Sequence, residues 1–416
     1  MLLGCIGDDF TGSSDLGLML AREGMHTVQY VGTPDRPAGD GVDAGIVALK
    51  TRTCPPAEAV RQSLEACRWL AAQGCRQFFF KYCSTFDSTP EGNIGPVIDA
   101  LMDELGTDRA IVCPVFPATG RQLFQGHLFV GDRLLNESGM QNHPLTPMTD
   151  PDIRRWLAPQ TRHGVGHVAF HTVLQGGPAI EAGIGAEVAA GRPVVVIDAV
   201  TDEDLRRIGV AAAGIRLVTG GSGIALGLPA NLIGTRTGDA AAWRGESGPA
   251  VILSGSCSTA TQGQVADHAR NHPALVIDPE QVLDGRQDAE SVAGWLLERA
   301  GDMPIAYSTA APESVTAIQA RFGRDAAANA VEELFAGVAR RLEAGGVKRI
   351  IVAGGETSGA VTSALGVRSM EIGPEIAPGV PALRVEGKDL VLALKSGNFG
   401  GPGFFGKALD ILGGQS

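Results

Sequence analysis

The residues best suited to chemistry begin with two adjacent carboxylates, Asp8 and Asp9, in the stretch GDDFTG that follows a short apolar run. Neighbouring carboxylates repel each other unless cations or hydrogen-bond donors stabilise them, and no basic residue stands beside this pair in the sequence. Thr11 and Gly12 follow at once, which predicts a turn from a strand into a helix. Such a pair indicates acceptors for substrate hydroxyls or for a transferred proton.

Three further polar clusters follow predicted strands in the same half of the chain. The stretch LKTRT contains Lys50 and Arg52, and Arg121 follows the double-proline loop in PVFPATGRQ. The longest cluster, KYCSTFDSTPEGNIG, contains Lys81, Ser84, Thr85, Asp87, Ser88 and Thr89. Cations suit a carboxylate, whereas Asp, Ser and Thr suit hydroxyls, so the clusters together predict a site for a small polyhydroxylated acid. His127, in FQGHLFVG, is a further candidate for substrate contact.

Helix capping is an alternative explanation for each cluster taken singly. Thr11, Ser13 or Asp15 would cap one helix, and Ser88 or Thr89 another. Ligands of open α/β sheets bind beyond the carboxyl ends of the strands. Four clusters at such positions within one half of the chain therefore favour a binding site.

Three loops rich in small residues stand in the C-terminal half, at residues 253–261 (LSGSCSTAT), 352–361 (VAGGETSGAV) and 394–406 (LKSGNFGGPGFFG). Backbone N–H groups of such loops, helped by a helix N-terminus, bind phosphates. An ordinary βα turn explains any one of them, and none matches GxxxxGK[ST] or GxGxxG. Three in one half favour a nucleotide site, with these candidates: Ser254, Ser256, Ser258, Gly354, Gly355, Glu356, Thr357, Ser358, Lys395, Gly397 and Gly400.

The elements that must position these residues alternate between strands and helices. Predicted strands are residues 2–7, 26–32, 44–50, 76–82, 109–115, 193–200, 215–220, 250–256, 274–278 and 303–309, and another begins at Val347. Helical periodicity is typical of residues 57–74, of the segment from Thr259 and of residues 329–344. This alternation predicts mostly parallel sheets with helices on both faces.

The pattern weakens between Leu228 and Pro249, where Gly, Pro and small polar residues are frequent. A chain of 416 residues is long for a single core. We therefore expect two Rossmann-like three-layer α/β domains, 1–230 and 250–416, joined by a linker over 231–249 and separated by a cleft.

Composition and charge narrow the class of protein. A net charge of −12 argues against binding of a nucleic-acid backbone. No apolar run approaches the ~18 residues of a membrane span, and the N-terminus lacks a signal peptide, so we expect no membrane partner. Seven cysteines without a CxxC pair are typical of a reducing cytoplasm, and we expect Cys67, Cys75 and Cys83, on a helix, a turn and a strand, to be small buried hydrophobes.

Two other chemistries fit the sequence poorly. His163, His167 and His171 have a spacing that suits zinc on a helix, but Gly164 and Gly166 interrupt it. The stretch LSGSCS lacks the GxSxG pattern of a nucleophile elbow. We expect these histidines to be structural or exposed.

Five motifs together resemble the four-carbon acid sugar kinases: GDDFTGSSDLG, KYCSTFDSTPEGNIGPV, SGSCSTATQGQ, GGETSGAV and LKSGNFGGPGFF. The resemblance extends from residue 4 to about 406, in the family's order. It implies an N-terminal domain that binds the sugar acid and a C-terminal domain that binds ATP. It also implies phosphorylation of the terminal hydroxyl of a tetronate-type acid, with ATP and Mg²⁺ as cofactors.

The middle motif of the family usually reads Lys-x-Asp-Ser-Thr-Leu-Arg-Gly-Asn. Here Pro90 and Glu91 replace the Leu-Arg pair, and the longer stretch resembles the 3-oxo-tetronate branch, with transfer to O4. A D-threonate or D-erythronate 4-kinase is the alternative. In either case Asp8 or Asp9 would orient O4 and accept its proton, with Asp87 the second candidate.

Two classes outside the sugar-acid kinases also stay open. A nicotinamide-dependent oxidoreductase would share the Rossmann-like halves but lacks the GxGxxG fingerprint. A non-catalytic sugar-acid-binding protein would have little need for three phosphate-type loops. The metal ligands are not identified by the sequence, and a homodimer is one oligomeric state that it leaves open.

Overall fold

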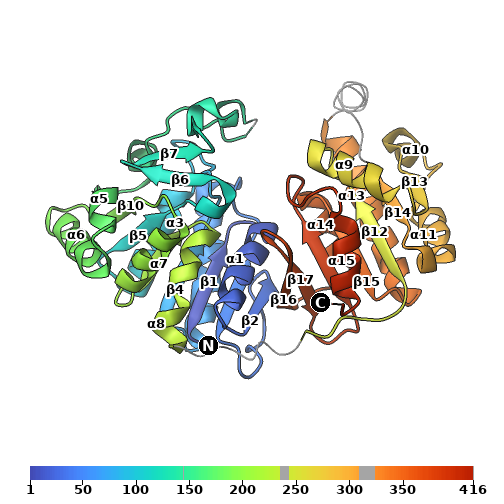
Figure 1. Ribbon diagram of the computed structural model, residues 1–416, viewed down its shortest axis with the longest axis horizontal. Coiled ribbons are helices and arrows are strands. Elements are labelled where there is room, and N and C mark those ends of the chain that lie inside the picture. The colour runs from blue at the N-terminus through green and yellow to red at the C-terminus, as the bar shows by residue number, and fades with distance from the viewer. Residues whose placement is uncertain (144, 235–242, 309–323, 416) are drawn as a thin grey trace. The chain divides into compact units, whose positions relative to one another are not determined.

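The computed structural model describes residues 1–143, 145–234, 243–308 and 324–415. The chain divides into two compact units, Met1–Ala241 and Ala242–Ser416 (Figure 1). Each unit is built on a largely parallel sheet with helices packed against it, which confirms the predicted α/β class.

The sheet of the N-terminal unit has the strand order β2-β3-β1-β4-β11-β5-β10-β9, with parallel pairing throughout. Its strands are β1 (Leu3–Gly7), β2 (Thr27–Val31), β3 (Ala44–Ala48), β4 (Gln77–Lys81), β5 (Ala110–Cys113), β9 (Val165–Val168), β10 (Val194–Ile197) and β11 (Leu217–Gly220). Strands such as β1 and β3 are buried along their whole length, because helices cover both faces of a parallel sheet. Each strand predicted in this half of the chain is confirmed, whereas β9 was not predicted.

The helices of this unit are α1 (Phe10–Arg22), α2 (Pro56–Ala72), α3 (Ile94–Leu105), α4 (Ile153–Leu157), α5 (Phe170–Val173), α6 (Gly177–Ala189), α7 (Asp202–Ala211) and α8 (Pro229–Ile233). The 3₁₀ segment η5 (Ser222–Gly227) packs against both α1 and α7, and α2 packs beside α3. Figure 1 shows α1 in front of β1 and β2.

Helix capping, the alternative explanation for the polar clusters, does not account for the residues considered. Asp9 caps α1, so Thr11, Ser13 and Asp15 lie inside that helix. Asn93 precedes α3 and makes no capping bond with its side chain. Ser88 and Thr89 do not cap α3, because both residues come several positions before it.

A small antiparallel sheet also belongs to this unit and was not predicted. It consists of β6 (Arg121–Phe124), β7 (His127–Val130) and β8 (Arg133–Leu134). The turn between β6 and β7 has two left-handed residues, Gln125 (φ 54°) and Gly126 (φ 75°). The buried carboxylate of Asp198, just after β10, accepts their N–H groups at 2.7 and 2.9 Å. This anchors the small sheet to the carboxyl edge of the large one.

The sheet of the C-terminal unit has the strand order β13-β14-β12-β15-β18-β17-β16. Its strands are β12 (Ala250–Ser254), β13 (Ala274–Val276), β14 (Ile305–Tyr307), β15 (Arg349–Ala353), β16 (Ser369–Ala377), β17 (Val380–Val385) and β18 (Val391–Lys395). Strand β17 runs antiparallel to β16 and β18, and the other pairs are parallel.

The helices of the C-terminal unit are α9 (Thr259–His268), α10 (Pro279–Leu283), α11 (Ala289–Glu298), α13 (Arg324–Ala344), α14 (Gly355–Ala364) and α15 (Phe404–Leu412). Helix α15 packs beside α9, and α13 packs beside α11 and α14. The helices predicted from Thr259 and over 329–344 correspond to α9 and α13.

The segment predicted as a linker, 231–249, contains residues 235–242, which lie outside the described residues. Its first residues belong to α8. Its last part is held by the C-terminal unit, since Trp243 donates to the carbonyl of Ile411 at 2.8 Å and Glu246 pairs with Arg384 at 2.8 Å.

Two smaller expectations can be compared with the structure. Cys67 and Cys75 are buried, as predicted, whereas Cys83 is half-buried in the loop after β4 and not on a strand. No helix in the described part of the chain has the length and apolar character to cross a membrane.

Candidate functional site

The paired aspartates lie at the centre of the carboxyl edge of the N-terminal sheet. Strand β1 lies between β3 and β4, and Gly7 at its end is in register with Ala48 on one side and Lys81 on the other. Because the three strands are parallel, the residues that follow them meet at one edge. The fold thus brings Asp8 and Asp9 beside Arg52 and Lys81, which the sequence separates by 44 and 72 residues.

These four residues form a charge cluster of two carboxylates and two cations. Arg52 donates from Nε and Nη2 to the two oxygens of Asp8, both at 2.8 Å, and from Nη2 to Asp9 Oδ1 at 2.6 Å. Lys81 Nζ donates to Asp9 Oδ1 at 2.9 Å and lies 3.9 Å from Asp8 Oδ1. The repulsion within the aspartate pair is therefore offset by cations from distant parts of the chain.

The two carboxylates differ in basicity. Burial raises the pKa of Asp8 above its usual range, although Arg52 and Lys81 oppose this shift. Burial would also raise the pKa of Asp9, but Arg52 and Lys81 outweigh it and hold that pKa well below its usual range. Burial would lower the pKa of Lys81, but the negative charges of Asp9 and Asp8 outweigh it and keep that pKa raised. Asp8 is the more basic member of the pair.

The start of α1 is shaped to hold Asp9. Asp9 Oδ2 accepts hydrogen bonds from Gly12 N at 3.1 Å and from Thr11 Oγ1 at 3.0 Å. A Cβ atom on Gly12 would lie 1.8 Å from Lys81 Nζ, so only glycine lets the lysine reach the carboxylate. Of the predicted substrate contacts, Thr11 and Gly12 therefore serve the cluster itself in this structure.

A cavity of about 340 Å³ adjoins Arg52. Its lining includes Arg52, Thr53, Cys54, Ser88, Thr89 and Asn93. The loop before α3 supplies one wall, and the loop after β3 supplies the other. The cavity thus combines a guanidinium with hydroxyl and amide groups, the chemistry that a hydroxylated acid requires.

The polar residues of the loop before α3 are largely engaged with one another. The Ser88 hydroxyl accepts from Trp156 Nε1 and Gln160 Nε2, both at 3.1 Å, and donates to the carbonyl of Phe86 at 3.0 Å. Thr85 donates to Asp87 at 2.5 Å. Phe86 is fully buried with φ of 57°, a conformation that a bulky residue keeps only when its surroundings hold it.

The roles of the other predicted substrate residues stay predictions. Lys50 is exposed, and Ser84 is half-buried. Arg121 donates to the carbonyl of Thr119, and its Nε is buried without a partner among the described residues. His127 Nδ1 lies 2.8 Å from the carbonyl oxygen of Gln125.

In the C-terminal unit the three predicted loops converge. Strands β12, β15 and β18 are adjacent and parallel, so their following loops share one edge. Ser258 caps α9 by accepting from Thr261 N at 3.2 Å. Ser258 and Thr261 also donate to the carbonyl of Gly397, at 2.5 and 2.8 Å, which ties the first loop to the third.

Small residues make this convergence possible. A Cβ on Gly255 would lie 2.1 Å from Thr357 Oγ1, and one on Gly397 would lie 2.6 Å from Ser256 Oγ. Gly354 has φ of 127° and donates its N–H to the carbonyl of Lys395 at 2.9 Å. The other predicted residues vary in exposure: Ser254, Thr357 and Ser358 are buried, whereas Gly355, Glu356 and Gly400 are exposed or half-buried.

Lys395 is fully buried beneath these loops. Its Nζ donates to Thr261 Oγ1 at 2.8 Å and to the carbonyl of Gly397 at 3.1 Å. Burial lowers the pKa of Lys395 to about 8. Among the described residues no carboxylate forms an ion pair with it, so the edge carries an uncompensated positive charge near the α9 N-terminus. Direct contact of Lys395 with phosphate stays a prediction.

Sequence reasoning missed Asn93, Thr261 and Gln264 as members of these sites. Gln264 donates from Nε2 to the carbonyls of Phe399 and Gly400, at 3.0 and 2.8 Å, and so supports the third loop. Each missed residue lies inside one of the five motifs, close to residues that were named as candidates. Their position within these motifs could have identified them as members of the sites.

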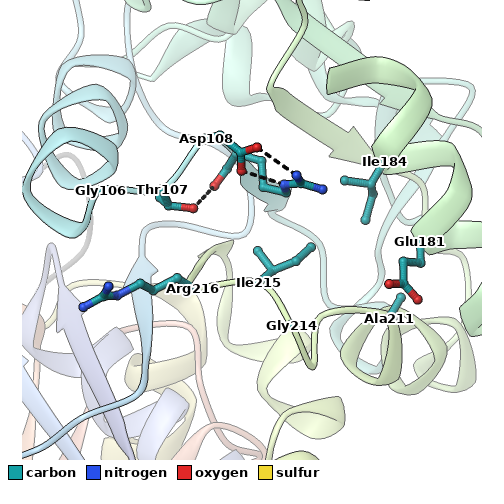
Figure 2. A pocket seen from close by; sticks show the side chains of 10 residues that line it. Gly106, Thr107, Asp108, Glu181, Ile184, Ala211, Gly214, Ile215 and Arg216 are labelled. Carbon is teal, nitrogen blue, oxygen red and sulfur yellow. Dashed lines mark hydrogen bonds and ion pairs between the residues drawn. The ribbon is translucent and has the colours of Figure 1, made fainter. Parts of the chain in front are cut away.

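A second cavity of the N-terminal unit, about 400 Å³, lies at the opposite edge of the sheet (Figure 2). It opens where β5 and β11 begin, and Arg109 at its wall pairs with Asp108 at 2.8 Å. Ligands of such sheets bind at the carboxyl edge, so this cavity is not the candidate site.

The described histidines form no metal site. His167 Nε2 lies 2.9 Å from Asp198, within the anchor of the small sheet. Within residues 1–143, 145–234, 243–308 and 324–415, no group of three His, Cys, Asp or Glu side chains is arranged to hold a metal ion.

The fold and these two edges define a two-domain α/β protein with one edge suited to a hydroxylated acid and another suited to phosphate. Residues 3–228 match the family described as a sugar-binding N-terminal domain, and residues 251–405 match a nucleotide-binding C-terminal domain.

Full-length relatives define the family more narrowly. The 3-oxo-tetronate kinases of Cupriavidus necator and Burkholderia multivorans are 52% and 50% identical to this chain over 100% of its length and 98% of theirs. Two solved structures, each 43% identical, cover 98% of this chain: one from Salmonella typhimurium LT2 (TM-score 0.91, 98% of that chain) and one from Haemophilus influenzae (TM-score 0.85, 100%). The chain belongs to the 3-oxo-tetronate kinase family, which confirms the resemblance.

Proposed function

We propose that this protein is an ATP-dependent kinase that transfers the γ-phosphoryl group to the O4 hydroxyl of 3-oxo-tetronate. The observation that carries the proposal is the 52% identity, over the whole chain, to a protein named 3-oxo-tetronate kinase. Kinase chemistry requires a bound acceptor and a bound nucleotide, and the two edges described above offer complementary chemistry for them.

The sugar acid would bind at the carboxyl edge of the N-terminal unit, in the cavity beside Arg52. Arg52 uses Nε and Nη2 for the aspartates, while Nη1 makes none of the hydrogen bonds found among the described residues. That leaves Nη1 as a charged donor for the substrate carboxylate or for the 3-oxo group. Thr89 would contact a hydroxyl from the opposite wall.

Asp8 is the favoured acceptor for the O4 proton. Its pKa is raised by burial, whereas that of Asp9 is held low by two cations. A carboxylate suffices as a base here, because the proton leaves late in a loose phosphoryl-transfer transition state. Asp9 would instead hold Lys81 and the start of α1 in place.

ATP would bind at the converging loops of the C-terminal unit. The N–H groups near Ser256, Ser258 and Gly397 and the N-terminus of α9 would receive phosphate oxygens, with the charge of Lys395 beneath them. These loops offer hydroxyls and N–H groups and no carboxylate cluster, which fits a Mg²⁺ ion held chiefly by the phosphates. When bound, the ion would neutralise phosphate charge.

The test is an ADP-release assay of the protein with 3-oxo-tetronates, D-threonate and D-erythronate, followed by NMR of the product. We expect the highest kcat/KM with a 3-oxo-tetronate and a phosphomonoester at O4. A preference for threonate or erythronate would support the alternative kinase, and phosphate at another oxygen would refute the assigned position. Absence of ADP release with every acid would favour a binding protein.

A further inference from the structure

Asn93 is the last residue before α3, and its side chain reaches across to the loop that carries Arg52. Its Nδ2 lies within hydrogen-bond distance of three carbonyl oxygens, those of Thr51 (2.5 Å), Arg52 (3.3 Å) and Cys54 (3.3 Å). The side chain is buried, with 7% of the residue exposed. An amide N–H₂ directed at three acceptors has a single workable orientation, with the nitrogen toward the loop.

The same loop is held from its other side by the paired aspartates. The backbone N–H groups of Thr51 and Arg52 both donate to the carbonyl of Asp8, at 2.9 and 3.2 Å. The Arg52 guanidinium then returns to the carboxylate of Asp8. Asn93 and Asp8 therefore clamp the backbone of residues 51–54 between them.

Asn93 is itself fixed by its neighbours. Ser88 accepts hydrogen bonds from Trp156 and Gln160, and Gln160 Oε1 accepts from Gly95 N at 3.3 Å. A Cβ on Gly95 would lie 2.5 Å from the backbone of Gln160, so the start of α3 is pressed against that segment. The start of α3, which carries Asn93, is thus held by packing against Gln160 as well as by the loop to which Asn93 donates.

We propose that Asn93 is a positioning residue that sets the placement of the Arg52 guanidinium for the sugar acid. The inference rests on the proposed function, because it concerns the acceptor site of that kinase. Removing the amide frees three carbonyls of the 51–54 loop and lets the guanidinium shift, and a shift of about 1 Å in a binding group can cost about 10²-fold in rate.

The experiment compares Asn93→Ala and Asn93→Asp with the full-length wild type. We expect Asn93→Ala to raise KM for 3-oxo-tetronate about tenfold while KM for ATP stays within about twofold. Asn93→Asp keeps the shape but turns an acceptor toward three carbonyls, so it should lose at least as much kcat/KM. Asn231→Ala is the matched control, since that residue also donates to a carbonyl (Gly209, 2.7 Å) but lies on α8.

A double-mutant cycle with Arg52→Lys separates positioning from a general structural role. If Asn93 acts through Arg52, Asn93→Ala should cost much less kcat/KM in the Arg52→Lys background than in the wild type. Equal losses in both backgrounds, or equal rises in both KM values, would overturn the inference while leaving the proposed function intact. Absence of ADP release from the wild type would overturn the proposed function and this inference with it.

Discussion

The two candidate sites of this protein differ in how their buried charges are balanced. At the N-terminal edge, Asp8 and Asp9 are matched by Arg52 and Lys81, so four buried or half-buried charges balance without a ligand. At the C-terminal edge, the buried Lys395 donates to a hydroxyl and a carbonyl and lies over the ring of Phe404, and it has no ion pair with a carboxylate among the described residues. One site is neutral and tightly bonded, and the other carries positive charge beneath glycine-rich loops.

The difference fits the ligand that we propose for each site. A hydroxylated acid has one charge and several hydroxyls, so its site needs a rigid arrangement of donors and acceptors more than excess charge. Polyphosphate has several negative charges, and a buried cation beside backbone N–H groups gains its counter-charge only when phosphate binds. Substitutions confined to one site therefore test this contrast.

The largest effect is expected from Asp8→Asn. The change removes the more basic carboxylate and disturbs two of the three hydrogen bonds that the Arg52 guanidinium donates to the aspartates, so kcat should fall about 10²–10⁴-fold in an ADP-release assay. Asp9→Asn should cost less, because asparagine also caps helices. Near-normal turnover of Asp8→Asn would show that this carboxylate is not the base.

Gly12→Ala should affect the N-terminal site alone. The added Cβ would displace Lys81 from Asp9, so we expect kcat/KM for the sugar acid to fall about 10²-fold with little change in KM for ATP. Gly39→Ala is the control, because a Cβ there meets nothing within 4 Å. A parallel rise of KM for ATP would argue against separate sites.

Gly397→Ala should impair the nucleotide site alone. Its Cβ would collide with Ser256 and open the junction of the first and third loops, so KM for ATP should rise about tenfold while KM for the sugar acid is retained. Gly401→Ala, where a Cβ meets open space, is the matched control. Unchanged ATP kinetics in Gly397→Ala would remove these loops from the nucleotide site.

The smallest effect is a pH dependence from Lys395. Because burial lowers its pKa to about 8, ATP affinity should decrease as pH rises through about 8 and the charge is lost. The folded pKa lies below the unfolded one, so the charged form costs stability below pH 8 and the cost is relieved as pH rises further. Titration calorimetry of Lys395→Met should show a flat profile, with exposed Lys407→Met behaving as wild type. A wild-type profile in Lys395→Met would contradict this assignment.

Much of the fold was predictable because it depends on local patterns. Buried parallel strands such as β1 and β4 are continuous apolar runs, and glycine or polar residues mark their ends. Strand β16 was missed because Gly373 and Pro374 interrupt it and the pairing with β17 shifts register there. The small sheet β6–β8 was missed because its strands are two to four residues long.

The sequence names candidate residues for the site but does not show the contacts among them. The sequence places Asp8, Arg52 and Lys81 at or just after the ends of strands, yet their pairing depends on β1 lying between β3 and β4, which no local pattern shows. The support that Asn93 and Ser88 give to neighbouring loops is equally non-local. Long-range packing therefore decided which polar residues hold the structure and which remain available for a ligand.

Hydrogen exchange of the full-length protein with each ligand alone tests whether the two edges bind different ligands. We expect 3-oxo-tetronate to slow amide exchange around residues 8–12, 50–54 and 88–93, and a non-hydrolysable ATP analogue to slow it around 255–261, 354–358 and 396–400. Protection of the N-terminal segments by the nucleotide alone, or of the C-terminal loops by the sugar acid alone, would contradict this expectation.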